Sequence, residues 1–512
     1  MSGQSVMSKP TLKAGAWSLL AVLALAAGCN FAPKYKVPPM ATPPAYKETK
    51  DWTNAEPADA VIKGKWWEMF NDAQLNALED QVNVSNQNIV AALENFLAAR
   101  AVAKQTYSQL FPTVSANPSV TRGKLSANSG GGSVSGASVG GTNAVGSVGA
   151  APGVGNLYSA YALPVDASWE PDLWGSIRNT VAGSTYGAQA TAAQLENMRL
   201  TLQAEVAVDF YELRSQDELI ELYASTIQGY KDSLALTKTL FETGIDSDLD
   251  VAQADSLLET TLAQATALGI QRAQYEHAIA LLVGQPASTY SLKPAPLASK
   301  PPPVPLGVPA QLLERRPDIA AAERSVASSN AAIGVARAAY YPTISLTGAA
   351  GLQSSTMANL LESSSFYWTA AAAASEVIFD AGKRKAVTQQ AWANYRAGVA
   401  NYRQTVLAAF QQVEDNIAAL RILATELHQQ DVAVKAAQRN LDLAFERYRL
   451  GINSYLNVIT AQVSLLSNQQ TYVTIHMQQM TSSVQLVMAL GGGWNANDMP
   501  SPKSVLHEAA SH

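Results

Sequence analysis

The chain carries one sequence pattern twice. The segment GIDSDLDV begins at Gly244, and the segment GINSYLNV begins at Gly451, an offset of 451 − 244 = 207 residues. Upstream, Phe111-Pro112-Thr113 matches Tyr341-Pro342-Thr343 at an offset of 342 − 112 = 230 residues. Features that stay in register over such distances indicate a duplicated structural unit. The extra residues of the first copy fall in a Gly- and Ser-rich stretch, 129–155.

The N-terminal residues indicate export. Lys9 and Lys13 precede an apolar run, 14–27, that is too short to span a bilayer comfortably. The run ends at Cys29, the only cysteine, which in the plainest interpretation is an incidental buried residue after a signal peptide. Residues 25–29 resemble the bacterial lipobox, although that motif prefers leucine where Ala26 stands. The resemblance implies a signal peptide over 1–28 and a covalent lipid on Cys29, where two or three acyl chains give a firm anchor.

Two long stretches, 176–243 and 383–450, contain no proline and have helical periodicity. Each would form a helix roughly 100 Å long. In the second stretch, apolar residues recur in steps of three and four, as in a coiled-coil seam: Tyr395, Val399, Tyr402, Val406, Phe410, Val413, Ile417 and Leu420. The other faces are rich in Gln, Asn, Ala and Ser. We therefore expect these helices to pack sideways on other helices, with their polar faces in water.

Each long stretch is followed by a turn signal. Gly244 and Gly451 stand where a helix ends in a left-handed cap. Ser247 and Ser454 can then cap the start of the next helix. The sequence therefore predicts two helical hairpins. Their return helices are expected to end near a repeated pair, Val283-Gly284 and Leu490-Gly491. A further helix is expected from about 72 to 110.

Short segments in which residues alternate with period two precede each long stretch. Polar residues take one face of 113–121 and apolar residues the other, and the alternation recurs over 161–169 and 343–350, while 366–379 is expected to be the returning strand of the second hairpin. These lengths suit tilted strands that cross a bilayer. The sequence predicts two β-hairpins, over 112–172 and 342–380, which give four strands. The alternative is a soluble protein in which two hairpins lie on a helical domain.

Four membrane strands cannot stand alone. An open sheet leaves two edges whose backbone groups lipid cannot satisfy. Closure needs at least eight strands. A dimer would supply eight, with an interior filled by side chains, and a trimer would supply twelve, which is wide enough for a lumen. The same assembly would gather the long helices into a tube with polar faces inward, so the sequence predicts a pore continued by a helical conduit.

The sequence offers little for catalysis or nucleic-acid binding. Charged residues make up 15% of the chain and the net charge is −6, so there is no basic excess for nucleic acid. The five histidines lack metal-ligand spacing, and His507-Glu508 lies in a tail expected to be frayed. We find no Ser/His/Asp signature and no phosphate loop. We therefore expect no enzyme activity and no cofactor other than the lipid on Cys29.

Several motifs in a fixed order point to a family. They are Pro33–Pro38 (PKYKVP), Trp66–Phe70 (WWEMF), Leu313–Glu323 (LERRPDIAAAE) and the two tip turns. Over nearly all of 29–494 the chain resembles the TolC-like outer-membrane factors, in the lipoprotein branch that serves resistance-nodulation-division (RND) efflux pumps. The resemblance implies a mixed, mainly α fold with an internal two-fold repeat. It also implies a homotrimer with a twelve-stranded transmembrane β-barrel, four strands per chain, continued by a long periplasmic α-helical barrel.

The resemblance and the repeat together give a division of the chain. After the signal peptide, residues 29–71 form a lipidated tether and an equatorial segment. The first repeat occupies 72–290 and the second 291–494, and 495–512 is a C-terminal tail. The family's equatorial region implies contributions from residues near 62–72 and 290–315 and from the C-terminus.

The resemblance also implies a function. The expected protein is an outer-membrane channel of a Gram-negative bacterium that extends into the periplasm. It would passively conduct small molecules such as drugs or solvents, be opened by a periplasmic adaptor protein and be driven by an inner-membrane RND-type pump. Two alternatives are a type I protein-secretion channel and a non-conducting periplasmic or surface scaffold.

In the family the helical tips close the periplasmic mouth and contact the adaptor. The gate positions so implied are Asp246, Asp248, Asp250, Tyr448, Asn453, Asn457 and Thr460. The implied adaptor-contact positions are Gly244, Ile245, Ser247, Leu249, Gly451, Ile452, Ser454 and Leu456. Tyr448 and Asp250 match family gate positions, whereas relatives often carry aspartate where Asn457 and Thr460 stand. We therefore expect weaker block by polyvalent cations at the second tip. An alternative role for the three aspartates is helix N-terminal capping.

Overall fold

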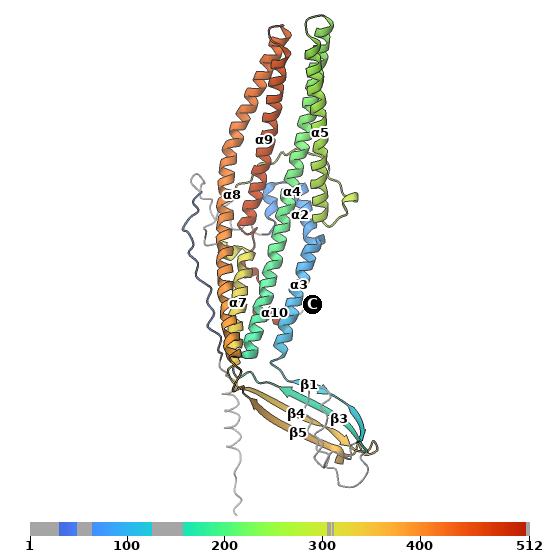
Figure 1. Ribbon diagram of the computed structural model, residues 1–512, viewed down its shortest axis with the longest axis vertical. Helices are drawn as coiled ribbons and strands as arrows, with labels where there is room; N and C mark the ends of the chain where they lie inside the picture. The colour runs from blue at the N-terminus through green and yellow to red at the C-terminus, as the bar shows by residue number, and fades with distance from the viewer. Residues whose placement is uncertain (1–29, 49–63, 125–156, 305–308, 310–311, 508–512) are drawn as a thin grey trace, which may run out of the picture. The chain divides into compact units, whose positions relative to one another are not determined.

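The computed structural model describes residues 30–48, 64–124, 157–304, 309 and 312–507 (Figure 1). The described residues form two compact units. The first unit comprises Met1–Pro33, Gln105–Val181 and Ala331–Ala391, and the second comprises Lys34–Lys104, Ala182–Asn330 and Trp392–His512. The first unit holds the β-sheet, and the second holds most of the helical residues. The predicted signal peptide, Cys29 and the whole Gly-rich stretch lie outside the described residues.

The first unit contains an antiparallel sheet. Its strands are β1 (Thr113–Ala116), β2 (Ser119–Lys124), β3 (Leu157–Trp169), β4 (Thr343–Ser354) and β5 (Phe366–Ser375). Both β1 and β2 pair with β3, β3 pairs with β4, and β4 pairs with β5 (Figure 1). Two hairpins from the two repeats therefore share one sheet.

The strand predicted over 113–121 is interrupted. Thr113 pairs with Ser168 and Ser119 pairs with Ala162, so β1 and β2 keep a single register on β3. Between them, Pro118 lacks a backbone N–H, and so does Pro164 on the partner strand. The Asn117 amide still donates to the Pro164 carbonyl at 3.3 Å. The missing N–H donors of the two prolines, and not a change of register, thus interrupt the hydrogen bonding. Because β1 and β2 together act as one strand, the chain contributes four strands, as predicted.

The sheet has two chemically different faces. Residues paired across neighbouring strands project to the same face. One such row is Ala116, Val165, Ala350 and Trp368, and the adjacent row is Ser115, Asp166, Ala349 and Thr369. The predicted alternation of apolar and polar residues is therefore confirmed in the observed register. An apolar face opposite a polar one is the pattern of a transmembrane β-sheet.

The helices confirm the duplication element by element. The helix before each hairpin is α3 (Gln87–Ser108) in the first repeat and α7 (Pro317–Ala338) in the second. The first residues of these two helices are 230 positions apart, and so are their last residues. The long helices α4 (Ser176–Glu242) and α8 (Lys383–Arg449) and the return helices α5 (Asp248–Leu282) and α9 (Tyr455–Ala489) differ by the downstream offset at both ends. In the second unit α4 runs beside α5, and α8 beside α9 (Figure 1). None of the helices within the described residues is both long and apolar enough to cross a membrane.

The helix predicted from about 72 to 110 is divided. The short 3-10 helix η1 (Trp66–Phe70) is followed by α2 (Ala73–Ser85), and Asn86 is extended before α3 begins. The Asn86 side chain accepts from the Asn88 amide at 2.9 Å and donates to the Leu282 carbonyl at 2.7 Å. Arg316 takes the equivalent place in the second repeat and donates to the Ala489 carbonyl at 2.9 Å. In both repeats a polar side chain thus ties the start of one helix to the end of the return helix.

Glycine is required at the same two junctions. Gly284 and Gly491 have φ values of 71° and 97°, in the left-handed region. A Cβ added to Gly284 would lie 2.5 Å from the Ser85 carbonyl oxygen, and one added to Gly491 would lie 2.1 Å from the Arg315 carbonyl oxygen. The repeated pairs predicted to end the return helices therefore allow two backbones to approach closely.

Apolar seams hold the helices of the second unit together. Along α8 the seam residues Tyr402, Val406, Val413, Ile417 and Leu420 are buried, which confirms the predicted coiled-coil pattern. The main core gathers Trp66, Phe70, Phe210 and Tyr211 with apolar residues of α4, α5 and α9. Of the equatorial segments expected near 62–72 and 290–315, Trp66, Phe70, Leu297 and Val304 are buried in this core.

The N-terminal tether is extended as expected and is also bound. Among its described residues, the backbone amides of Lys47 and Glu48 donate to the Glu414 carboxylate at 2.7 and 3.1 Å. The Glu48 carboxylate lies 2.7 Å from the Arg421 guanidinium. Long-range hydrogen bonds of this kind leave no periodic signal in the sequence.

The C-terminal residues up to His507 are also fixed, so the expectation that His507 lies in a frayed tail is wrong. The short helix α10 (Pro502–Leu506) buries Val505 against Ala103 and Ala188. The Arg100 guanidinium donates to the carbonyls of Ser504, Val505 and His507, each at 3.2 Å. A cation at the end of a helix, where carbonyls lack helical partners, is favourable. Residues 508–512 lie outside the described part of the chain.

Candidate functional site: the helical tips

The two predicted tip turns have the same backbone geometry. Gly244 and Gly451 have φ values of 76° and 68°, which confirms the predicted left-handed caps. The Ile245 amide donates to the Leu240 carbonyl at 2.9 Å, and the Ile452 amide donates to the Arg447 carbonyl at 2.9 Å. This pairing is the Schellman motif, in which glycine allows the chain to turn while the last helical carbonyls stay bonded.

The helices that follow the turns begin differently. In the first tip, Ser247 accepts from the Asp250 amide at 3.3 Å, and its hydroxyl donates to the Asp250 carboxylate at 2.6 Å. This capping box confirms the capping role considered for the aspartates at one of them, Asp250. In the second tip, Ser454 holds the N-cap position, but its side chain makes no capping bond, so the prediction that it caps is wrong. Asn457 replaces the aspartate there, and no carboxylate holds the serine hydroxyl in place.

A buried hydrogen bond joins the two tips. Near the end of α8, Tyr448 is only 2% exposed. Its hydroxyl donates to the Asp246 carboxylate of the first tip and lies 3.0 Å from the Thr237 hydroxyl of α4. Burial, and then the Asp246 carboxylate, raise the pKa of Tyr448 well above its ordinary value. The phenol therefore stays protonated at neutral pH and can donate this bond.

A second tyrosine supports the junction. Tyr455, the first residue of α9, is buried with its ring centroid 5.2 Å from that of Tyr448. Its hydroxyl lies 3.1 Å from the Ser233 hydroxyl of α4. The sequence indicated Asp246 and Tyr448 as separate gate positions but gave no sign that they are partners. Tyr455 carried no predicted role, although its place directly after a predicted cap could have marked it as a buried anchor.

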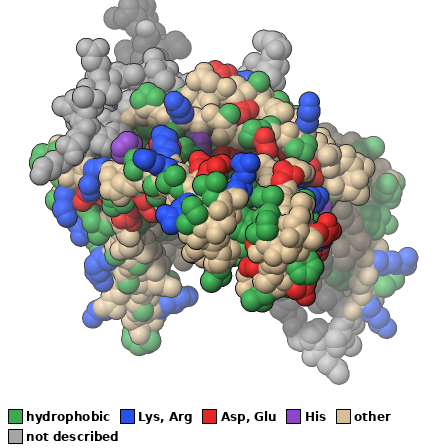
Figure 2. Space-filling model, turned by 90° about the horizontal axis from the view of Figure 1, so that it is seen from above, with side chains coloured by type: hydrophobic (Ala, Val, Ile, Leu, Met, Phe, Trp, Pro, Cys, Tyr) green, Lys and Arg blue, Asp and Glu red, His purple; other side chains and the backbone are tan. Residues whose placement is uncertain are grey.

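The other predicted tip residues lie mostly at the surface. The exposed members are Gly244, Ile245, Asp248, Leu249, Gly451, Ile452, Leu456, Asn457 and Thr460, and Asn453 is half-buried. The Thr460 hydroxyl donates to the Leu456 carbonyl of its own helix at 2.9 Å. Seen from above, hydrophobic and acidic side chains lie next to one another on the molecule (Figure 2). The structure therefore brings Asp246 and Tyr448 together and leaves four apolar tip side chains in solvent: Ile245, Leu249, Ile452 and Leu456.

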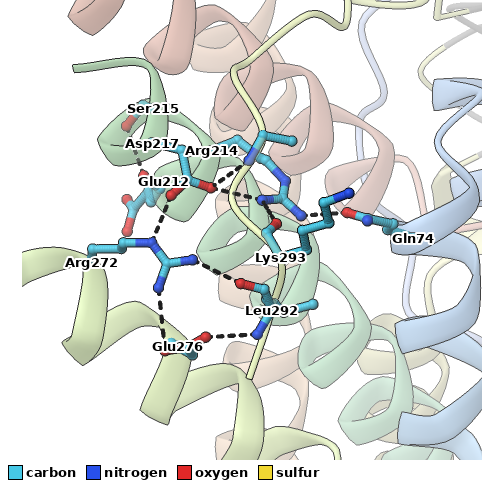
Figure 3. Close-up of polar contacts among 10 residues, drawn as sticks. Gln74, Glu212, Arg214, Ser215, Asp217, Arg272, Glu276, Leu292 and Lys293 are labelled. Atoms are coloured by element: carbon cyan, nitrogen blue, oxygen red, sulfur yellow. Dashed lines mark hydrogen bonds and ion pairs between the residues drawn. The ribbon is translucent and has the colours of Figure 1, made fainter. Parts of the chain in front are cut away.

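A buried ionic network lies away from the tips. Asp217 of α4 accepts from Arg214 at 2.7 Å and from Arg272 of α5 at 2.7 Å, and the Asp217 and Arg214 side chains are 2% and 4% exposed (Figure 3). Arg272 also pairs with Glu276 at 3.3 Å. The Arg214 guanidinium additionally donates to the Gln74 amide oxygen of α2. Several elements of the second unit therefore meet at one carboxylate.

The network also binds the segment that links the two repeats. Arg272 donates to the Leu292 carbonyl at 2.8 Å, and the Leu292 amide donates to Glu276 at 2.6 Å (Figure 3). The Ala295 amide donates to Asp217 at 3.1 Å, and Arg214 donates to the Lys293 carbonyl at 3.0 Å. Sequence reasoning missed these residues because ordinary charged residues on helix faces give no sign of burial.

The described residues offer little for metal binding. No group of three or more His, Cys, Asp or Glu side chains within them could hold a metal ion. The predicted lipid attachment at Cys29 lies outside the described residues.

A sheet with one apolar and one polar face, joined to helices of 67 residues that end in closed turns, defines an outer-membrane channel. The outer membrane efflux protein family matches residues 78–285 and 308–492, and the chain belongs to this family. It is 33% identical to the solvent efflux pump outer membrane protein SrpC of Pseudomonas putida, over 93% of this chain and 97% of the relative. It is accordingly an outer-membrane component of an efflux system.

Solved structures support the same assignment. The outer-membrane channel OprN is similar, with a TM-score of 0.80 and 29% identity over 91% of this chain and 100% of that chain. The open state of the MtrE outer-membrane channel of Neisseria gonorrhoeae is similar, with a TM-score of 0.77 and 26% identity over 92% and 100% of the two chains.

Proposed function

We propose that the chain forms a homotrimeric channel through which an RND-type pump expels small molecules. The observation that carries the proposal is the pair of open sheet edges. Within the described residues, β5 pairs only with β4, and β1 and β2 pair only with β3. Lipid cannot satisfy such edges, so copies must join them. Three copies supply twelve strands and leave a lumen, whereas two copies supply eight strands whose side chains fill the interior.

The two faces of the sheet fit this assembly. The row with Val165 and Trp368 would face lipid, and the row with Asp166 and Thr369 would face water in the lumen. Transport is then passive, and an inner-membrane pump supplies the energy through a periplasmic adaptor. The relative SrpC is named as a solvent efflux component, which favours drugs or solvents as cargo. A lipid on Cys29 would add a second membrane attachment.

Planar-bilayer recording of the purified protein tests conduction. We expect discrete conductance steps after insertion. A preparation that inserts into the bilayer and never conducts would favour a scaffold and contradict the channel.

The Tyr448–Asp246 bond provides a test of the proposed gate. Tyr448→Phe removes the hydroxyl that donates to Asp246 and keeps the buried ring. A hydrogen bond to a charged group contributes about 1.5–3 kcal/mol, so we expect the open-to-closed ratio to rise by roughly tenfold to a hundredfold in bilayer recordings. The matched control is Tyr211→Phe, because the buried Tyr211 hydroxyl has no hydrogen-bond partner within the described residues. Equal open probability in the two variants would remove Tyr448 from the gate.

The exposed tip residues are proposed as the adaptor contact. Ser454→Arg places a charge between Ile452 and Leu456, which are both exposed. Burying that charge against a partner is costly, so we expect drug tolerance to fall to the level of a strain without the channel. The yield of trimer should remain normal. Ser364→Arg, an exposed serine in η4 (Ser363–Ser365), is the control and should keep full tolerance. Full tolerance in the Ser454→Arg strain would exclude the tip as the contact.

A further inference from the structure

A cavity separates the two helical hairpins of the second unit. Its volume is about 580 Å³, and its walls come from α4 on one side and from α8 and α9 on the other. This volume lies within the range of cavities that bind small organic molecules. None of the residues proposed for the gate or for the adaptor contact lines it.

Two buried polar groups of the cavity wall have no partner. Tyr230 of α4 and Gln462 of α9 are each 5% exposed. The Tyr230 hydroxyl and the Gln462 amide oxygen make no hydrogen bond within the described residues. A buried polar atom without a partner costs about 1–3 kcal/mol, so native proteins seldom keep one unless something binds there. The wall therefore offers a hydroxyl and an amide oxygen to an occupant.

The charge of the cavity wall is of one sign. Asp442 and Glu446 of α8 belong to the lining, and no lysine or arginine does. The Glu446 carboxylate forms an ion pair with the Arg449 guanidinium at 3.3 Å. Asp442 accepts from the Gln438 amide at 2.9 Å and has no ion-pair partner within the described residues. One carboxylate is thus available to a cation.

The rest of the wall supplies apolar and aromatic surface. Phe445 lies in the lining between the two carboxylates in sequence, and its helix face also carries Leu441. An aromatic ring attracts an organic cation, and aliphatic side chains bind an apolar body. The wall therefore combines a negative charge, an aromatic surface and two free hydrogen-bonding groups.

We propose that this cavity binds an amphipathic organic cation. The cationic group would lie near Asp442 and Phe445, and a hydrogen-bonding group on the apolar body would reach Tyr230 and Gln462. Because the walls belong to both hairpins, an occupant contacts both and stabilises the arrangement that keeps them together. None of the proposed gate residues lines this site, and its test requires no transport.

Binding can be measured with the full-length protein in lipid nanodiscs. The probe is ethidium, an aromatic cation with amino groups, studied by equilibrium dialysis against empty nanodiscs of the same lipid. We expect saturable binding of one ethidium per protomer. Asp442→Asn should weaken binding at least tenfold, and Tyr230→Phe should weaken it several-fold, because each removes one named contact.

Two glycines provide a matched pair of filling variants. Gly229 of α4 lines the cavity, and a Cβ added to it meets nothing within 4 Å. Gly269 of α5 also has open space and lies outside the lining. Gly229→Phe should therefore abolish saturable binding without unfolding the protein, and Gly269→Phe should keep it. Equal saturable binding in wild type and Gly229→Phe, or binding to wild type no greater than to empty nanodiscs, would overturn the proposal.

Discussion

Replacement of Asp217 by alanine is expected to lower the free energy of unfolding by about 3–5 kcal/mol per chain, because the change leaves buried charge without its partner. Asp217 is the shared acceptor of Arg214 and Arg272, and the Asp217 side chain is 2% exposed. Of the two guanidiniums, Arg214 would lose its only paired carboxylate among the described residues, whereas Arg272 keeps Glu276. Chemical unfolding followed by circular dichroism at one fixed protein concentration measures the loss.

The same helix provides a control for Asp217. Glu196 and Arg199 form a pair with the same three-residue spacing at 2.8 Å, but their side chains are 31% and 37% exposed. Glu196→Ala should cost less than about 1 kcal/mol, because solvent screens exposed pairs. Hydrogen exchange adds a local measurement. The Ala295 amide, which donates to Asp217, should exchange faster in Asp217→Ala only. Equal stability losses in the two variants would contradict the assigned role of burial.

The second large effect concerns a buried acid without a partner. Glu79 of α2 is fully buried, and neither carboxyl oxygen has a hydrogen-bond partner within the described residues. Its neighbours on the same helix face are Leu75, Leu78 and Val82, which are all buried. Burial, and then the Asp80 charge, raise the pKa of Glu79 well above its ordinary value of 4.5. The folded protein therefore holds this carboxyl neutral at a pH where the unfolded chain ionises it.

The direction of the pH effect follows from this difference. Because the folded pKa is raised, the contribution of Glu79 to stability is complete below pH 4.5 and is lost as the pH rises towards the folded pKa. The loss is about 1.4 kcal/mol per pH unit per chain in that window. Glu79→Gln, which is neutral and of similar shape, should lack this slope. We therefore expect the variant to gain stability on wild type progressively as the pH rises above 4.5 towards the folded pKa.

Unfolding curves at a series of pH values test the prediction. Glu79→Leu should remove the same slope as Glu79→Gln, because both remove the titrating group. Parallel stability profiles for wild type and both variants would show that Glu79 is ionised in the folded protein, and would contradict its burial without a partner.

Much of the fold could be predicted because it depends on local signals. The proline-free stretches, the left-handed glycines at Gly244 and Gly451 and the period-two segments each reflect a backbone preference that acts within a few residues. The internal repeat supported these predictions further, because each signal occurs in both repeats. The proposed gate residues Asp246 and Tyr448 were indicated by the family resemblance and not by such a local signal.

The features that could not be predicted depend on contacts between distant residues. Tyr448 and Asp246 are 202 positions apart, and Arg100 lies about four hundred positions from the tail that it holds. Asn86 divides a helix because its side chain donates a hydrogen bond to the carbonyl of the last residue of α5. Nothing in the local sequence separates the buried Asp217 from the half-buried Glu196, since burial is a property of the packed helices.

The central claim is that open sheet edges force three copies of this chain into one channel. Native mass spectrometry of the purified protein in detergent tests it most directly, because the measured mass gives the number of chains without reference to activity. We predict a single dominant species of three protomers, each carrying a covalent lipid. A dominant species of one or two protomers, obtained under conditions that preserve the sheet signal in circular dichroism, would contradict the account.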